Sequence, residues 1–310
     1  MPPHPHFSWM ALTPSNLDRC IPLWGDRAGY ESSGFAQTLT RIRRLLREDR
    51  ARGRIIIDEQ GRPRAFGVSV FVTEPAGERL AKAPLPLIGK QLLQDPTWNS
   101  LVLGSREIAR RNASGGLQMV VVNQGYDDRQ LTDEGWAILL GALIQAFIDV
   151  HQGFRLARVT IEAFGERGAS FVARTWPNVV QSWVQTKDGQ AFCAARWAFT
   201  RVEAEQQGGA LLPMFNYRRP ILALTTAEKD VLRIALTGVT DPAIAKALDI
   251  PLASVKGRWS RIFRRVAETP LGSLLDADKR NGQRGPQFRH IVVDHVRKNP
   301  SELTPFDPTL

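Results

Sequence analysis

The residues of this chain best suited to chemistry form a basic cluster near its carboxyl end. Residues 252–266 contain no acidic side chain and five basic ones: Lys256, Arg258, Arg261, Arg264 and Arg265. Cations gathered in one place attract a polyanion more strongly than the same charges spread over a surface. Small residues among them, such as Gly257 and Ser260, would let a helix backbone approach a groove. This pattern predicts contact with the phosphates and base edges of double-stranded DNA.

Helix start and stop signals predict three short helices that would position this cluster. Thr225 and Glu228 have the spacing of a capping box, and Gly238 would end the helix that they begin. Asp241, which is followed by proline, has the pattern of a cap for a second helix. Pro251 separates that helix from the third one.

The third helix is expected from about residue 252 to residue 268. At 3.6 residues per turn, one narrow stripe contains its apolar residues, Val255, Trp259, Ile262 and Val266. That stripe would pack against the other two helices. The small residues and cations lie on the opposite side, where a recognition helix presents its side chains to DNA.

The stretch from 224 to 266 resembles the LuxR/GerE-type helix-turn-helix. The signature of that family reads L-T-x-x-E-x-x-V-L, then G, then I-A-x-x-L-x-[IL], then [TS]-V-K. The matching residues here, all in register, are Leu224-Thr225, Glu228, Val231-Leu232, Gly238, Ile244-Ala245, Leu248, Ile250 and Ser254-Val255-Lys256. The stretch is similar also to the fourth region of sigma factors, in which V-K-x-R matches residues 255–258.

The resemblance implies an all-α DNA-binding domain whose third helix enters the major groove. It implies contacts of Ser254 and Lys256 with phosphates or base edges at the start of that helix. The complete set of expected DNA-binding residues is Ser254, Lys256, Gly257, Arg258, Ser260, Arg261, Arg264 and Arg265.

The first 202 residues have a different pattern, in which helices and strands alternate. Period-2 alternation with a turn predicts a hairpin, and a valine-rich run predicts a buried strand before a long apolar helix. The expected elements are helices at 15–23, 34–50, 92–112, 132–151 and 166–176 and strands at 54–58, 65–73, 117–123, 157–163, 179–186 and 192–202. The sequence therefore predicts an α+β or α/β domain with a mixed sheet.

This layout resembles the GNAT-type N-acetyltransferases. Residues 12–23 and 55–72 are similar to the opening helix and to the second and third strands of that family. The family's motif [RQ]-x-x-G-x-[GA], whose amides hold the pyrophosphate of coenzyme A, is missing, because residues 124–135 have only Gly125 and Gly135. The same stretch carries four carboxylates, and residues 166–176 carry no tyrosine that could serve as a general acid. We therefore expect a GNAT-like fold with no catalytic and no cofactor-binding residue.

Composition limits the remaining classes. The chain has 310 residues, 43% of them hydrophobic, which is enough for folded cores, and a net charge of +10. Cys20 and Cys193 cannot form a disulfide framework, and no Cys or His cluster has the spacing of metal ligands. The start of the chain does not have the pattern of a signal peptide. The longest apolar run, 136–150, is shorter than a bilayer-spanning helix. These observations predict a cytoplasmic protein without a metal, a cofactor or a membrane partner.

Four segments are expected: a sensory or dimerisation domain at 1–202, a linker at 203–221, the helix-turn-helix at 222–270 and an extension with one helix at 271–310. Together they predict a DNA-binding transcriptional regulator that is not an enzyme. Its expected partners are double-stranded DNA, a second copy in a homodimer and RNA polymerase, and its effector is not identified by the sequence. Two alternatives stay open: a GNAT-type N-acetyltransferase with an appended DNA-binding domain, and a sigma-like factor.

Overall fold

The chain folds into two compact units. The first contains Met1–His151 and Arg155–Phe215, and the second contains Gln152–Phe154 and Asn216–Leu310. The computed structural model describes residues 6–24, 32–127, 131–175, 181–187, 190–208, 211–272 and 286–307.

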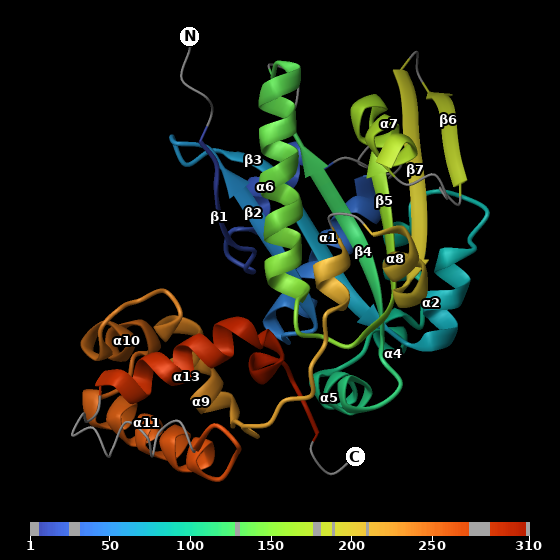
Figure 1. Ribbon diagram of the computed structural model, residues 1–310. Helices are drawn as coiled ribbons and strands as arrows, with labels where there is room; N and C mark the ends of the chain where they lie inside the picture. Colours follow the sequence, from blue (N-terminus) through green and yellow to red (C-terminus); the bar gives the residue numbers. More distant parts are fainter. Residues whose placement is uncertain are drawn as a thin grey trace. The chain divides into compact units, whose positions relative to one another are not determined.

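A seven-stranded sheet forms the centre of the first unit, with the order β1-β2-β3-β4-β5-β7-β6 (Figure 1). The strands are β1 (Ser8–Ala11), β2 (Ala51–Ile57), β3 (Pro63–Val72), β4 (Leu117–Tyr126), β5 (Leu156–Phe164), β6 (Gln181–Lys187) and β7 (Gln190–Thr200). Neighbouring strands are antiparallel except for β4 and β5, which are parallel. This mixed sheet with its helices fits the GNAT-like fold that the sequence predicts.

The parallel pair β4 and β5 stays together over only part of its length. The two strands pair from Leu117 to Val120 on β4 and from Leu156 to Thr160 on β5, and the pairing ends there although both strands continue. A bulge shifts the register between β4 and β3 directly after this point, opposite Val68 and Ser69. A bulge bends a strand and increases its twist, so β4 turns away from β5 where the site described below begins.

Helices cover both faces of the sheet, because alternate residues of each strand are apolar on both sides. Ile55 and Phe66 pack on one face, in a core shared with the helices before β4, while Ile56 and Ala65 pack on the other. The elements between β1 and β4 are η1 (Leu17–Leu23), α1 (Ser32–Arg47), α2 (Glu74–Ala81), α3 (Ile88–Gln94), α4 (Trp98–Leu101) and α5 (Ser105–Ala113). The other face carries α6 (Asp133–His151) and α7 (Glu166–Thr175), which follow β4 and β5.

Helix α6 is apolar around most of its circumference. With 19 residues, the helix is long and apolar enough to cross a bilayer. The apolar run at 136–150, with 15 residues, is too short to predict this. The helix packs instead against β2 and β3, where Leu139 and Ala146 are buried beside Ile56 and Ala65. Of the 18-residue apolar window of this helix, 28% is buried inside the protein.

The second unit is helical. It contains α9 (Thr226–Ala235), α10 (Asp241–Leu248), α11 (Leu252–Ala267), α13 (Pro286–Lys298) and η4 (Pro300–Leu303). The predicted capping box of Thr225 and Glu228 is present at the start of α9. The predicted stripe of α11 is buried in the core of this unit, with Val255, Ile262 and Val266 fully buried and Trp259 nearly so.

Three details differ from the predictions. Strand β1 and helix α2 were not expected, because four exposed residues and a short Pro- and Gly-containing stretch give little periodicity. Within 203–221 the structure has the end of α8 (Arg201–Gln207) and η3 (Leu212–Phe215), and a capping box of Thr200 and Glu203 starts α8. Asp241 does not cap α10, since Thr240 holds the cap position and Asp241 lies in the first turn.

Candidate functional site

A cavity lies where β4 and β5 separate, on the face of the sheet that α6 and α7 cover. It measures about 810 Å³ with its open mouth included. Its walls come from β3, β4, α6, β5, α7, β7 and the segment before η3, and most of them are aromatic or aliphatic. The lining residues are Gly67, Val121, Gln124, Tyr126, Trp136, Leu140, Leu143, Ile144, Phe147, Ile161, Ala163, Gly168, Phe171, Trp197 and Leu211. A concave apolar wall with a few polar groups is typical of a small-molecule site.

Trp197 brings an unused hydrogen-bond donor to this cavity. It lies on β7 opposite Ile161 of β5, so both side chains point to the face that α6 and α7 cover. The residue is 6% exposed, and its indole Nε1 is buried with no hydrogen-bond partner among the described residues. A buried N–H without an acceptor costs free energy, so Trp197 Nε1 is a candidate donor to a ligand that enters the cavity lined by this side chain.

Two side chains of β4 reach across the separation to β5. The Gln124 amide donates to the Glu162 carbonyl at 2.8 Å, and the Tyr126 hydroxyl donates to the Phe164 carbonyl. The hydroxyl lies against the start of α7, where a Cβ on Gly168 would collide with it. Glycine at that position therefore leaves the room that the tyrosine hydroxyl occupies.

Tyr126 is a functional candidate that the sequence reasoning missed. That reasoning looked for a tyrosine on residues 166–176 and found none. The structure brings a phenolic hydroxyl to this helix from β4 instead. Because residues two apart on a strand share a face, the pair Gln124 and Tyr126 at the end of a buried strand is a signal that could have found it.

The start of α6 is acidic, as the sequence indicated, but its carboxylates are partly neutralised. Asp133 lies 3.1 Å from Arg167 of α7, and Asp127 lies 3.7 Å from Arg64 of β3. Asp128, another of the four carboxylates in this stretch, lies outside the described residues. The apolar cavity and the Trp197 donor fit the thioester-bearing arm of coenzyme A. The acidic first turn of α6 fits its pyrophosphate poorly, because a helix start favours anions only when it is not already occupied by carboxylates.

A buried ion pair lies behind the cavity, on the opposite face of the sheet. Arg196 and Glu162 are 0% and 3% exposed, and the guanidinium donates to one carboxylate oxygen at 2.7 and 2.9 Å. The other oxygen accepts from the Ile88 backbone N–H at 2.8 Å. Burial raises the pKa of Glu162, against the lowering effect of Arg196. Since both oxygens are occupied, this pair fixes the start of α3 to β5 and leaves no free group for chemistry.

The eight residues expected to bind DNA all lie on α11, and they differ in what they contact. Ser254, Lys256, Ser260, Arg261 and Arg264 are exposed, while Gly257, Arg258 and Arg265 are half-buried. Arg265 and Arg261 approach the buried Glu228 at 3.1 and 3.7 Å, and Arg258 donates to the Ala227 carbonyl at 3.4 Å. Three of the five cations therefore hold α11 to α9.

Metal chemistry has no candidate in the described ranges. Within them, no group of three or more His, Cys, Asp or Glu side chains could hold a metal ion. Cys20 is a buried free thiol, and burial raises its pKa to about 12. A thiol with so high a pKa is a small core residue and not a nucleophile.

The solved structures that resemble this chain include acetyltransferases. No protein-family model and no curated protein sequence matches the chain. Among solved structures, the spermidine/spermine N-acetyltransferase SpeG from Vibrio cholerae matches with a TM-score of 0.33 and 10% identity, covering 66% of this chain and 97% of that one. A provisionally assigned acetyltransferase from Acinetobacter baylyi matches with a TM-score of 0.30 and 10% identity over 63% of this chain and 93% of that one. A provisionally assigned phosphinothricin N-acetyltransferase has a TM-score of 0.31 and 10% identity, with coverage of 63% and 98%.

These matches overturn the prediction of a DNA-binding transcriptional regulator that is not an enzyme. The structures just described are acetyltransferases or are assigned as such, in agreement with the GNAT-like fold of the first unit. Because Arg258, Arg261 and Arg265 have partners on α9, the basic cluster of α11 offers less charge to a polyanion than its composition indicates. At TM-scores of 0.30 to 0.33 and 10% identity the likeness concerns the fold, and the chemistry of the site depends on this chain's own residues.

Proposed function

We propose that the first unit transfers an acyl group from a coenzyme A thioester to an amine. The observation that carries this proposal is the separation of β4 from β5 beyond Val120 and Thr160, with the cavity directly at that place. The resemblance to GNAT-type acetyltransferases supports it. The thioester is a substrate here, and the amine is its acceptor.

The separated strands offer a matching surface for the arm of coenzyme A. Beyond the last β4–β5 pair, the backbone of β4 that faces β5 has no ladder partner in that strand. An extended chain that contains amides can pair with such an edge as an added strand does. The apolar lining would then surround the thioester, and Trp197 Nε1 would donate to an oxygen of the ligand.

The reaction needs two proton transfers. The amine nitrogen attacks the thioester carbonyl carbon, so a C–N bond forms and the C–S bond breaks. The proton of the amine passes to solvent, and the departing thiolate takes up a proton. Tyr126 is the hydroxyl in the cavity wall that would give that proton on leaving its hydrogen bond to the Phe164 carbonyl, and it would recover one from water.

A transfer assay with matched cavity variants tests the proposal. Free thiol released from acetyl-CoA would be followed with polyamines, amino acids, arylamines and lysine peptides as acceptors. We expect amine-dependent thiol release that Leu140→Trp reduces at least 10-fold, because Leu140 lines the cavity. Ala137→Trp adds the same ring at an exposed position of α6 outside the lining and should leave the rate unchanged. Absence of both transfer and acetyl-CoA binding would contradict the proposal.

We propose separately that the second unit adds a nucleic-acid contact to this enzyme, in line with its resemblance to the LuxR/GerE-type helix-turn-helix. The exposed side of α11 carries a row of three residues, Lys256, Ser260 and Arg264. Neither Lys256 nor Arg264 has an ion pair among the described residues. Fluorescence anisotropy with a random-sequence duplex at two salt concentrations tests this. Lys256→Ala with Arg264→Ala should weaken binding at least 10-fold and lower the salt dependence, whereas the exposed Lys298→Ala should not. Unchanged affinity would contradict it.

A further inference from the structure

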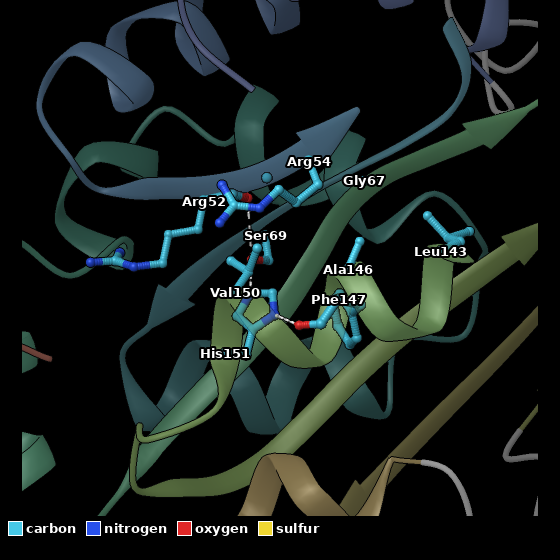
Figure 2. Close-up of a pocket in the computed structure, with 10 residues that line it drawn as sticks. Arg52, Arg54, Gly67, Ser69, Leu143, Ala146, Phe147, Val150 and His151 are labelled. Atoms are coloured by element: carbon cyan, nitrogen blue, oxygen red, sulfur yellow. Dashed lines mark hydrogen bonds between the residues drawn. The ribbon is translucent and has the colours of Figure 1, made fainter. Parts of the chain in front are cut away.

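A second, smaller recess lies between α6 and the strands β2 and β3. It measures about 250 Å³ with its open side included, and its lining is apolar on the side of α6. Its polar residues are Arg52, Arg54, Ser69 and His151 (Figure 2). We call it the Arg54 recess.

Ser69 and His151 form a closed, uncharged pair in this recess. The His151 Nδ1–H donates to the Phe147 carbonyl at 2.7 Å, since a carbonyl oxygen can only accept. Nε2 therefore accepts from the Ser69 hydroxyl at 2.5 Å. The pKa of His151 is lowered to about 3, mainly by burial and also by repulsion from Arg52 and Arg54, against the raising effect of the hydrogen bond to Phe147. Serine and histidine in this arrangement resemble a nucleophile with its base, but an imidazole with so low a pKa does not take up a proton near neutral pH.

Arg54 is the charged group of the recess that has no partner. It is half-buried, its Nε is shielded from solvent, and its guanidinium makes no hydrogen bond or ion pair with any residue in the described part of the chain. Asp149 affects it only through space, and that carboxylate already accepts from Gln145 at 2.8 Å. In Figure 2 the Arg54 guanidinium lies over Ser69.

Arg52 differs from Arg54 although it lines the same recess. Its guanidinium points away from Ser69 in Figure 2, lies 3.8 Å from Asp49 and stacks over the Phe71 ring at 5.6 Å. Of the two arginines, Arg54 alone is therefore available to an anion in the recess. One planar guanidinium beside a neutral imidazole suits a single carboxylate, which it can bind through two parallel hydrogen bonds.

The Arg54 recess borders the larger cavity. Gly67, Leu143 and Phe147 line both. Gly67 lies on β3 between Arg54 of β2 and Gln124 of β4, and a Cβ added to it would have no atom within 4 Å. The passage over Gly67 would let the apolar part of a ligand extend from the recess toward Phe147 and the wider space.

We propose that the Arg54 recess binds the carboxylate of a small organic acid, with the apolar part of that acid directed over Gly67. Arg54 is the ionic partner, and the Ser69–His151 pair shapes the recess without carrying charge. This inference does not depend on acyl transfer, since it concerns free acids and requires no coenzyme A.

Titration calorimetry with 3-phenylpropanoate and with its neutral amide tests the proposal. The acid should bind at least 10-fold more tightly than the amide, and Arg54→Gln should weaken the acid by about 10- to 100-fold with little effect on the amide. Arg52→Gln is the matched control and should keep at least half of the affinity. Gly67→Val should weaken the binding of 3-phenylpropanoate and leave the binding of acetate unchanged.

Thermal melting of each variant checks that it is folded. Arg54→Lys keeps the positive charge but not the two parallel donors of the guanidinium, so its affinity for the acid should lie between those of wild type and Arg54→Gln.

Three results would overturn the proposal. The first is equal affinity for the acid and its amide, and the second is an equal loss in Arg52→Gln and Arg54→Gln. The third is no binding of the acid at millimolar concentration. None of them would affect acyl transfer, which is measured without these acids, and failure of acyl transfer would leave the acid titration intact.

Discussion

Polar groups that could contact a ligand lie both around the cavity and the Arg54 recess of the first unit and on the surface of α11. The two sets differ in whether other residues of the chain already bind them. On α11, Arg261 and Arg265 approach Glu228, and Arg258 donates to a carbonyl of α9. In the first unit, Trp197 Nε1 and the Arg54 guanidinium have no partner among the described residues. Three of the five cations in the α11 cluster are held by α9, whereas the two groups on the α6 side are buried or half-buried without a partner.

This difference shows that a count of charges overstates what the α11 cluster can offer to a ligand. A cation that is already paired stabilises its own fold, and it offers a ligand only what remains after that pair is broken. A buried donor without a partner does not stabilise the fold through a hydrogen bond or an ion pair to the described residues. Unused donors in a cavity are therefore the better indicator of a binding site, and the predictions below test that comparison.

The largest effect is expected at Tyr126. Tyr126→Phe removes the hydroxyl at the start of α7 and keeps the ring, so kcat for acyl transfer should fall 100- to 1,000-fold with little change in the KM for acetyl-CoA. Steady-state kinetics measure this, and Tyr217→Phe in the second unit is the control. A rate within 3-fold of wild type would show that the hydroxyl is structural and would weaken the distinction between the two regions.

The next effect concerns His151 and pH. The native imidazole stays neutral down to about pH 3, whereas the unfolded one, with a pKa of 6.5, takes up a proton below that value. The free energy of unfolding should therefore fall by about 1.4 kcal/mol per pH unit as the pH is lowered from about 6 toward 4. Urea unfolding at several pH values measures this slope against His151→Gln, which should lack that part of it. Equal slopes would mean that His151 is not held neutral.

In the second unit, Glu228 should matter for stability because it holds the α11 cations. Although burial raises its pKa, the hydrogen bonds from Thr225 and the charge of Arg265 lower it, so it is ionised near neutral pH. Glu228→Ala removes the capping box and the partner of two arginines and should lower the free energy of unfolding of this unit by about 2 kcal/mol. Thermal or urea unfolding measures this, with the exposed Glu268→Ala as a control that should change it by less than about 0.5 kcal/mol. If both variants unfold alike, the arginines of α11 are free after all.

The smallest effect is expected at Gly257. In the middle of α11 a glycine is less favourable than alanine by up to about 1 kcal/mol, and a Cβ here would meet only Arg261, at 3.8 Å. Gly257→Ala should therefore raise the free energy of unfolding by about 0.5 to 1 kcal/mol, as read from the urea midpoint. A decrease would reveal a close contact at this position that the described chain does not contain.

The regular elements were predictable where periodicity is strong. The buried stripe of Val255 and Trp259, the capping box at Thr225 and the valine-rich strand β4 all follow from local spacing. The site was not predictable in the same way. Tyr126 reaches α7 only because β4 and β5 separate, and the unpaired state of Arg54 is set by residues far apart in sequence. Spacing predicts which face a residue occupies, but not whether its hydrogen bonds are satisfied.

Hydrogen–deuterium exchange of the full chain with and without acetyl-CoA tests acyl-CoA binding most directly. Acetyl-CoA that pairs with the separated strands should slow exchange at residues 121–126 and 161–164 and at the lining turns of α6, and exchange in the second unit should be unchanged. No protection at saturating acetyl-CoA, or protection confined to residues 216–307, would contradict the placement of the active site between β4 and β5.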